Sequence, residues 1–338
     1  MNVAVIGAGS IGQRHVRGVA RLRDELGVKA IRVYDPNEER RQAAVKLGTD
    51  ITACDSVSDA LTGVEAVLIC APTSLHTQVM RELLDAGNFH VFMEKPLASD
   101  AAGWATLIEE QTRRGKVFGV GYLLRKHPVL NRLRGLLADG ALGRVLHVRA
   151  ESGFYLPYWH PHEDYRHFYM SSRTGGGGAL LDTSHEIDYL TWLFGKVDEV
   201  QGTVQTISDL EITSDDMVLA TFRFRSGVVG QVHLDLLQFD ESRYCKVIGT
   251  KAVVRADIKT NELHLWAEGD KEWTVEKFSV EWDEVYGDEY RDFFRVCRGG
   301  EAPLVPGRDA LHVMEIIEAT RRSHSSGTRV RLPLWDLA

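Results

Sequence analysis

The sequence has few cysteines, few prolines and no apolar run long enough to cross a bilayer. It contains four cysteines, none in a Cys-x-x-Cys pair, and nine prolines in 338 residues. Scattered cysteines give no support to a disulfide-stapled secreted protein. Apolar runs such as residues 66–71 are far too short to cross a bilayer, and we expect no signal peptide. The expected location is therefore the reducing cytoplasm, with no membrane partner.

Positive charge is also in deficit. The chain has 40 Lys and Arg against 48 Asp and Glu, which gives a formal net charge of −8. This balance does not suit a nucleic acid or an anionic membrane as partner, so any phosphate must be held locally. The 44% hydrophobic content is that of an ordinary soluble α/β protein, and 338 residues favour two domains over one.

The first 121 residues alternate short apolar runs with segments of helical periodicity. Because such a rhythm with short connections requires right-handed crossovers, it predicts a doubly wound parallel sheet. The expected strands are residues 2–6, 30–34, 66–70, 90–93 and 117–121. The expected helices are residues 12–25, 38–47, 57–61, 76–86 and 101–114.

After a further helix at 128–139, strands predominate. They are expected at residues 145–152, 199–206, 217–225, 228–237, 244–248, 252–256, 263–267 and 273–278. Their alternation of apolar and polar residues predicts an open, mostly antiparallel sheet with one core face. Helices at 187–194, 288–297 and 309–321 could cover that face. We therefore predict a dinucleotide-binding α/β domain at 1–121 and an α+β domain for substrate binding and oligomerisation at 122–338.

The first strand runs into a glycine-rich loop, Gly7-Ala8-Gly9-Ser10-Ile11-Gly12. Gly7 allows the tight turn, Gly9 lets backbone N–H groups approach a pyrophosphate, and Gly12 allows close packing of helix and strand. Asp35 follows at the end of the next strand, as the dinucleotide-binding pattern requires. A carboxylate there accepts hydrogen bonds from ribose hydroxyls and repels a 2′-phosphate, which favours NAD. Arg40 lies close enough in sequence to leave NADP open.

Lys95 follows the fourth strand, in the segment Glu94-Lys95-Pro96-Leu97-Ala98. The carboxyl ends of the strands form the edge of a doubly wound sheet at which ligands bind. A lysine there can hydrogen-bond a substrate hydroxyl and stabilise negative charge as it develops on oxygen.

Several segments together resemble one family. They are the terminal GAGSIG, PTSLH after the third predicted strand, EKPLA, residues 121–125, and GGGALLDTSHEIDYLTWLFG at 176–195 with one glycine before it. In this order they resemble the glucose-fructose oxidoreductase and inositol dehydrogenase (Gfo/Idh/MocA) family over nearly the whole chain. The resemblance implies a Rossmann domain, an open-sheet domain, and NAD(P) in the cleft between them.

The resemblance also implies roles for individual residues. Lys95 would be the catalytic lysine and His185 the acid/base. Glu94 would reach the cofactor ribose, and Arg125 would lie at the floor of the cleft. The peptide bond before Pro96 is expected to be cis. The residues implied in cofactor binding, beyond those of the glycine loop and Asp35, are Ala71, Pro72, Thr73, His76, Glu94, Lys95 and Arg125.

The spacing around His185 departs from the family. The family places four steps between its catalytic Asp and His, whereas Asp182 and His185 are three apart. On one helix either offset keeps the pair on the same face. We expect Asp182 to orient the substrate, with Asp188 as the alternative.

Residues 155–167 combine aromatic and hydrogen-bonding side chains, which suits the apolar faces and hydroxyl rims of sugars. Arg166 could hold a carboxylate or phosphate. A lid or a dimer loop is an alternative, and a metal site at the histidines is the weaker one, so we expect no metal. The predicted substrate-binding residues are Tyr155, Trp159, His160, Arg166, Asp182 and His185.

Together these features predict an NAD(P)-dependent oxidoreductase acting on a secondary alcohol or ketone of a sugar-like substrate. A nucleotide-linked or surface-glycan sugar and a free cyclitol or aldose both remain open. A catalytically silent NAD-binding sensor is the rival from another class, although it would need neither Lys95 nor His185. We expect a homo-oligomer, a dimer or a tetramer, because a broad sheet with one uncovered face favours self-association.

Overall fold

The computed structural model describes residues 1–159, 161–303 and 305–334. Its backbone contacts divide the chain into two compact units. The first contains residues 1–123 and 282–311, and the second contains residues 124–281 and 312–338. Each unit is built around one sheet, as the sequence predicts.

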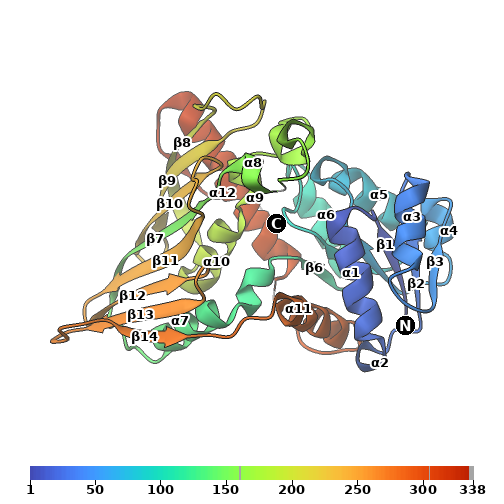
Figure 1. The fold of residues 1–338 in the computed structure, drawn as a ribbon, viewed down its shortest axis with the longest axis horizontal. Coiled ribbons are helices and arrows are strands. Elements are labelled where there is room, and N and C mark those ends of the chain that lie inside the picture. The colour runs from blue at the N-terminus through green and yellow to red at the C-terminus, as the bar shows by residue number, and fades with distance from the viewer. Residues whose placement is uncertain (160, 304, 335–338) are drawn as a thin grey trace. The chain divides into compact units, whose positions relative to one another are not determined.

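The first unit holds a six-stranded parallel sheet in the order β3-β2-β1-β4-β5-β6. Figure 1 shows β1, β2 and β3 of this sheet with α1 and α3 beside them. Apart from Asn2 and His90 at their starts, the central strands β1, β4 and β5 are apolar and buried, which is typical of a sheet covered on both faces. The strands are β1 (Asn2–Ile6), β2 (Ala30–Tyr34), β3 (Ile51–Ala53), β4 (Ala66–Ile69), β5 (His90–Met93) and β6 (Phe118–Val120). The crossover helices are α1 (Ser10–Arg21), α2 (Arg23–Leu26), α3 (Glu38–Val45), α4 (Val57–Ala60), α5 (His76–Ala86) and α6 (Trp104–Arg113).

The second unit holds a nine-stranded sheet in the order β14-β13-β12-β11-β7-β10-β9-β8-β15. All neighbouring pairs are antiparallel except β7 and β10, which run parallel. The predicted fold class is thereby confirmed. The strands are β7 (Val145–Gly153), β8 (Val197–Gln205), β9 (Met217–Phe224), β10 (Val229–Asp235), β11 (Ser242–Gly249), β12 (Ala252–Asp257), β13 (Glu262–Ala267), β14 (Thr274–Lys277) and β15 (Val330–Arg331).

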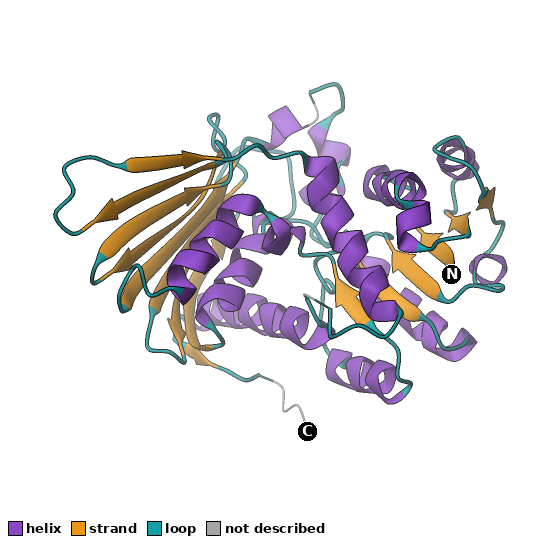
Figure 2. Ribbon diagram, turned by 90° about the horizontal axis from the view of Figure 1, so that it is seen from below, coloured by secondary structure: helices purple, strands orange, loops and turns teal. Residues whose placement is uncertain are grey.

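Helices pack along one face of this sheet, which Figure 2 shows. That face carries buried residues of the central strands, for example Val218, Ala220 and Phe222 of β9. The helices of the second unit are α7 (Pro128–Ala138), α8 (Leu156–Trp159), α9 (Ala179–Asp182), α10 (His185–Phe194) and most of α12 (Gly307–Ser326). Short 3₁₀ turns are η1 (Thr73–Leu75), η2 (Leu123–Lys126), η3 (Tyr165–His167) and η4 (Tyr169–Ser171).

The helix α11 (Trp282–Cys297) corrects one expectation. The amphipathic pattern of this segment predicts a helix that covers the open sheet. The helix instead belongs to the first unit and packs against α1 and α2. Tyr290, Phe293 and Phe294 of α11 are buried in the same apolar core as β1, β4 and Phe92. The first unit is therefore discontinuous in sequence, whereas the predicted division into residues 1–121 and 122–338 is continuous.

Candidate active site

The glycine loop lies between β1 and α1. Gly7 has φ +100°, and its N–H donates to the Tyr34 carbonyl at 2.8 Å. A Cβ at Gly7 would lie 2.6 Å from the Ala71 nitrogen, and one at Gly12 would lie 2.0 Å from the Gly7 oxygen. A Cβ at Gly9 would meet nothing within 4 Å. Gly7 and Gly12 are thus required by packing, whereas Gly9 leaves open space at the start of α1.

That open space fits a pyrophosphate. Gly9 is the N-cap of a twelve-residue helix, and no side chain caps it. The first turn of α1 carries no acidic residue. Free N–H groups and the positive end of the helix dipole favour an anion at this position. Ser10 is exposed and Ile11 half-buried beside it.

Asp35 lies directly beside the glycine loop. Its Oδ2 accepts the Ala8 N–H at 2.8 Å, and its Oδ1 accepts the Asn37 N–H at 2.9 Å. The carboxylate is thus held at the loop, where ribose hydroxyls of a bound dinucleotide are expected. Arg41, which sequence reasoning missed, donates from Nη1 to the Asp35 carbonyl at 2.8 Å, whereas Arg40 is exposed on α3.

The segment after β4 is tied to the Lys95 turn by His76. This histidine is 1% exposed; its Nε2 lies 3.0 Å from the Ala71 carbonyl and its Nδ1 3.0 Å from the Pro96 carbonyl. Burial lowers the pKa of His76, and a neutral ring donates its single N–H to one of these two carbonyls. His76 therefore connects two loops at the carboxyl edge of the sheet. Thr73 is buried nearby, and Pro72 is exposed.

Glu94 and Lys95 follow β5 at the same edge. The Lys95–Pro96 peptide bond is cis, as expected. Glu94 is 7% exposed, and its Oε2 accepts the Lys95 N–H at 3.1 Å. Its Oε1 lies 2.5 Å from Nε2 of His15, a buried residue of α1 that the sequence analysis did not single out. The helical spacing of His15 with Val16 and Val19 was the one available signal, and it indicated only burial.

In the second unit, Arg125 forms a buried ion pair with Asp188. The side chains are 2% and 1% exposed, and Arg125 donates from Nε at 3.0 Å and from Nη2 at 2.7 Å to the two carboxylate oxygens. The guanidinium also faces the Trp192 ring, 6.0 Å from its centroid. Both oxygens of Asp188 are thus used to hold α10 to η2, which favours a structural part for Asp188.

Asp182 and His185 are not on one continuous helix, contrary to the assumption behind their spacing. Asp182 ends α9, His185 begins α10, and Thr183 and Ser184 form a turn between them. Asp182 is 7% exposed, and its Oδ2 accepts the Gly178 N–H at 2.9 Å. His185 is 6% exposed. The glycine run therefore fixes Asp182, and α10 fixes His185 separately.

Glu186, the next residue on α10, forms a second buried ion pair. Its carboxylate is fully buried and accepts Arg243 Nε at 2.7 Å and Nη2 at 3.2 Å. Arg243 comes from β11, so the pair ties the start of α10 to the sheet. Sequence reasoning missed this contact because the two residues are 57 positions apart.

The aromatic segment forms its own cluster. The Tyr155 ring packs against Tyr158 and Phe239, with centroids 4.9 and 4.6 Å apart, and Trp159 packs against Phe154. Arg166 contacts Asp164 with two nitrogens and Glu211 with a third, at 2.6–3.0 Å. Its charge is thus already balanced by two carboxylates. His160 lies outside the described residues.

Two further observations concern the described part of the chain. No three His, Cys, Asp or Glu side chains there come together as a metal site would require. No helix there is both long and apolar enough to span a membrane.

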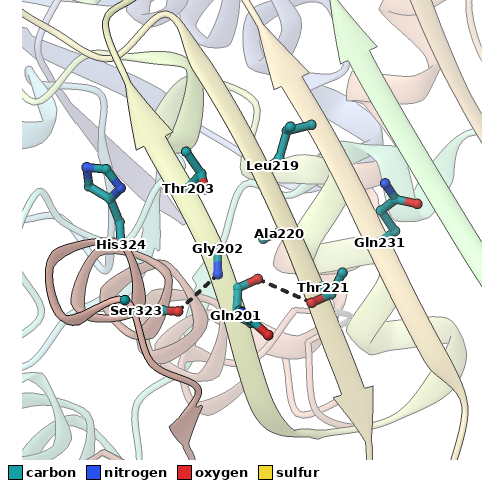
Figure 3. A pocket seen from close by; sticks show the side chains of 10 residues that line it. Gln201, Gly202, Thr203, Leu219, Ala220, Thr221, Gln231, Ser323 and His324 are labelled. Carbon is teal, nitrogen blue, oxygen red and sulfur yellow. Dashed lines mark hydrogen bonds between the residues drawn. The ribbon is translucent and has the colours of Figure 1, made fainter.

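A hollow of about 370 Å³ lies on the second sheet (Figure 3), and none of the predicted site residues lines it. Its lining is largely uncharged and polar: Gln201, Gly202, Thr203, Leu219, Ala220, Thr221, Gln231, Ser323, His324 and Gly327.

Comparison with known proteins gives relatives along the whole chain. Myo-inositol 2-dehydrogenase of Thermotoga maritima is 27% identical over 98% of each chain. A solved structure of levoglucosan dehydrogenase with NADH and levoglucosan superposes with a TM-score of 0.87 at 20% identity, covering 98% of this chain and 99% of that one. The WlbA dehydrogenase of Bordetella pertussis with NADH and UDP-GlcNAcA gives 0.81 at 24% identity, covering 99% of each. At such identities, the structural likeness shows the fold.

Family assignment comes from the two halves of the sequence. Residues 1–122 match the "Oxidoreductase family, NAD-binding Rossmann fold", and residues 134–332 match the "Oxidoreductase family, C-terminal alpha/beta domain" of the same family. The predicted enzyme class and the predicted NAD cofactor are confirmed at the level of the family. This chain therefore belongs to the Gfo/Idh/MocA family of NAD-dependent oxidoreductases.

Proposed function

We propose that the protein oxidises a secondary alcohol of a sugar-like substrate, or reduces the corresponding ketone, with NAD(H) as cofactor. The observation that carries the proposal is the carboxyl edge of the first sheet. Lys95 and Glu94 lie there at the end of β5, in the same sheet as the open glycine loop and Asp35. Anion site, ribose acceptor and cation thus share one sheet edge.

Each residue has a role that its chemistry supports. When bound, NAD accepts a hydride and NADH donates one. Lys95 Nζ hydrogen-bonds the reacting oxygen and stabilises the negative charge that develops there. His185 removes the hydroxyl proton during oxidation and returns it during reduction. Asp182, held by the Gly178 N–H, orients the substrate.

Cofactor binding is assigned to a wider set. Backbone N–H groups at Gly9, Ser10 and Ile11 hold the pyrophosphate, and Asp35 accepts from the adenosine ribose. The loops carrying Ala71, Pro72 and Thr73 border the nicotinamide portion, with His76 as the buried support beneath them. Glu94 accepts from the other ribose. Arg125 acts indirectly, because it is committed to Asp188.

For the substrate we propose an uncharged polyol or sugar ring. Tyr155 and Trp159 offer apolar ring faces, and Arg166 is balanced by Asp164 and Glu211, so it provides little attraction for a nucleotide phosphate. The inositol 2-dehydrogenases among the relatives are named for a substrate of this kind. A nucleotide-linked sugar, as in the WlbA complex, is the alternative.

A ligand screen followed by variants tests the proposal. Inositols, free sugars and nucleotide sugars are added with NADH, because a ligand that binds the native state raises the melting temperature. With a turned-over substrate, Lys95→Ala should lower kcat roughly 10²–10³-fold. His185→Ala should lower it about 10²–10⁴-fold.

Two exposed residues supply matched controls. Lys46→Ala on the first unit and His324→Ala on the second should retain wild-type kcat.

Asp182→Asn should lower kcat and leave NADH affinity nearly unchanged. Wild-type turnover in both the Lys95 and His185 variants would reject the assigned roles. Binding of NADH with no turnover of any polyol or sugar would favour the sensor.

We also propose that the protein self-associates through the uncovered face of the second sheet. Leu219 and Val229 are 41% and 45% exposed on that face, on neighbouring strands. Covering them removes apolar surface from water. Light scattering coupled to size-exclusion chromatography measures the mass, and a 37.9 kDa monomer at micromolar concentration would contradict the proposal.

A further inference from the structure

The contact between His15 and Glu94 joins two motifs that are 79 residues apart. His15 lies on α1, three residues after the last glycine of the loop, and Glu94 directly precedes Lys95. The side chains are 0% and 9% exposed, with Nε2 and Oε1 2.5 Å apart. A buried histidine at this position is thus in direct contact with the carboxylate that we assign to the cofactor ribose.

The surroundings of His15 decide which nitrogen carries the proton. Its ring lies among Phe92, Tyr286 and Tyr290, with centroids 5.5, 6.1 and 5.4 Å away in edge-to-face arrangements. Nδ1 is buried and has no hydrogen-bond partner among the described residues. Because a buried N–H without an acceptor is costly, we assign the proton to Nε2, which donates it to Glu94.

The Glu94 carboxylate is consequently held at both oxygens. Oε1 accepts from His15, and Oε2 accepts from the Lys95 backbone N–H at 3.1 Å. Each carboxylate oxygen can accept a second hydrogen bond. The two contacts therefore fix the plane of the carboxylate and still leave acceptor capacity for hydroxyl groups of a ligand.

We propose that His15 is a positioning residue: it holds the Glu94 carboxylate in the orientation that accepts hydrogen bonds from the ribose of NAD(H). This inference rests on the proposed function, because it uses the assignment of Glu94 to the cofactor. It also links the anion site to the Lys95 turn, since α1 carries the glycine loop at one end and His15 in its middle. A role in packing alone would be met by any side chain that fills the aromatic surroundings.

The affinity for NADH, measured by fluorescence titration, tests the proposal without a substrate. His15→Phe fills the space and removes the donor, and we expect the Kd for NADH to rise roughly 10- to 100-fold, as for loss of a hydrogen bond to a charged group. His15→Gln places a donor near the position of Nε2, and should stay within about threefold of the wild type. His15→Met replaces His15→Phe if the latter does not fold, as judged by its melting curve.

Tyr290→Phe is the matched control. It lies in the same surroundings and loses a buried hydroxyl that has no hydrogen-bond partner among the described residues. We expect its Kd for NADH to equal that of the wild type. A shift equal to that of His15→Phe would mean that packing in this region, and not the donor, sets the affinity, and would overturn the proposal.

Glu94→Gln separates this inference from the proposed function. If His15 acts through Glu94, adding His15→Phe to Glu94→Gln should change the Kd little further. Additive losses would overturn the inference. Unchanged NADH affinity in Glu94→Gln would also overturn it, while turnover of a polyol would leave the proposed function intact. The expected pattern in a protein that turns over no substrate would support the inference and reject the function.

Discussion

Replacement of Asp188 by Asn tests whether the ion pair with Arg125 is structural. The substitution keeps the size of the side chain and removes its charge, so the Arg125 guanidinium remains buried opposite a neutral amide. Both side chains are at most 2% exposed, and both carboxylate oxygens accept from the guanidinium. The charge on Arg125 then lacks the carboxylate that balances it in the wild type.

The expected loss follows from this burial. Breaking a buried ion pair by removing one partner costs about 3–5 kcal/mol. For a unit the size of the second one, 1 kcal/mol corresponds to roughly 2–4 °C, so the melting temperature should fall by about 6–20 °C. Replacing both residues by apolar ones, Arg125→Met with Asp188→Leu, should recover most of the loss because no charge stays buried.

Urea unfolding followed by circular dichroism measures the free energy of unfolding for the wild type, for Asp188→Asn, for the single variants Arg125→Met and Asp188→Leu, and for the double variant. The reasoning fails if Asp188→Asn loses less than about 1 kcal/mol, or if the double variant loses the sum of the single losses. Normal stability with lowered kcat would instead assign Asp188 to the substrate.

Three further predictions concern pH, the glycine loop and cofactor choice. Burial, and then the charge of Arg243, lower the pKa of His127 to about 4. At pH values below about 6.5, the ordinary pKa of histidine, the unfolded state therefore binds more protons than the folded state. The free energy of unfolding should fall by roughly 2 kcal/mol as the pH is lowered from 7 to 5. In urea titrations, the free energy of unfolding of His127→Gln should fall by roughly 2 kcal/mol less than that of the wild type over the same pH interval. Gly9→Ala should melt like the wild type but bind NADH roughly tenfold or more weakly, because its Cβ would enter the open space in which we propose that the pyrophosphate binds. Gly12→Ala should lower the melting temperature, because its Cβ would lie 2.0 Å from a carbonyl oxygen of the loop; equal melting of the two variants would contradict this. Asp35→Ala should narrow the preference for NADH over NADPH, because a hydrogen bond to a charged group is worth about 1.5–3 kcal/mol. If paired fluorescence titrations show an unchanged preference, Asp35 does not discriminate between the two cofactors.

Much of the fold could be predicted because single segments encode it. Apolar runs and glycine turns located β1, β2 and β5, and the alternation of apolar and polar residues located β9 and β10. β3 was missed, because three residues at a sheet edge are too short to show a period. α11 was recognised as amphipathic but assigned to the wrong sheet, since an apolar stripe does not say which surface will cover it.

The candidate site was predictable where local motifs carry it and not where tertiary contacts complete it. The glycine loop, Asp35 and Lys95 follow directly from strand ends. His15 and Glu94 meet only because α1 and the end of β5 come together in the folded sheet, and neither has a neighbour in sequence that indicates the other. The turn at Thr183 and Ser184 depends on how the glycine run packs, so spacing alone could not reveal it.

The discontinuity of the first unit has a consequence for synthesis of the chain. The apolar core of that unit includes Tyr290, Phe293 and Phe294, which leave the ribosome only after residues 124–281 have been made. At 5–20 residues per second this delay is on the order of ten to thirty seconds. During that interval the growing chain holds the whole parallel sheet but lacks the helix that completes its core. A nascent chain paused in this region should therefore expose apolar surface and be a candidate for chaperone binding, and a fragment that ends near residue 122 should be poorly folded when made alone.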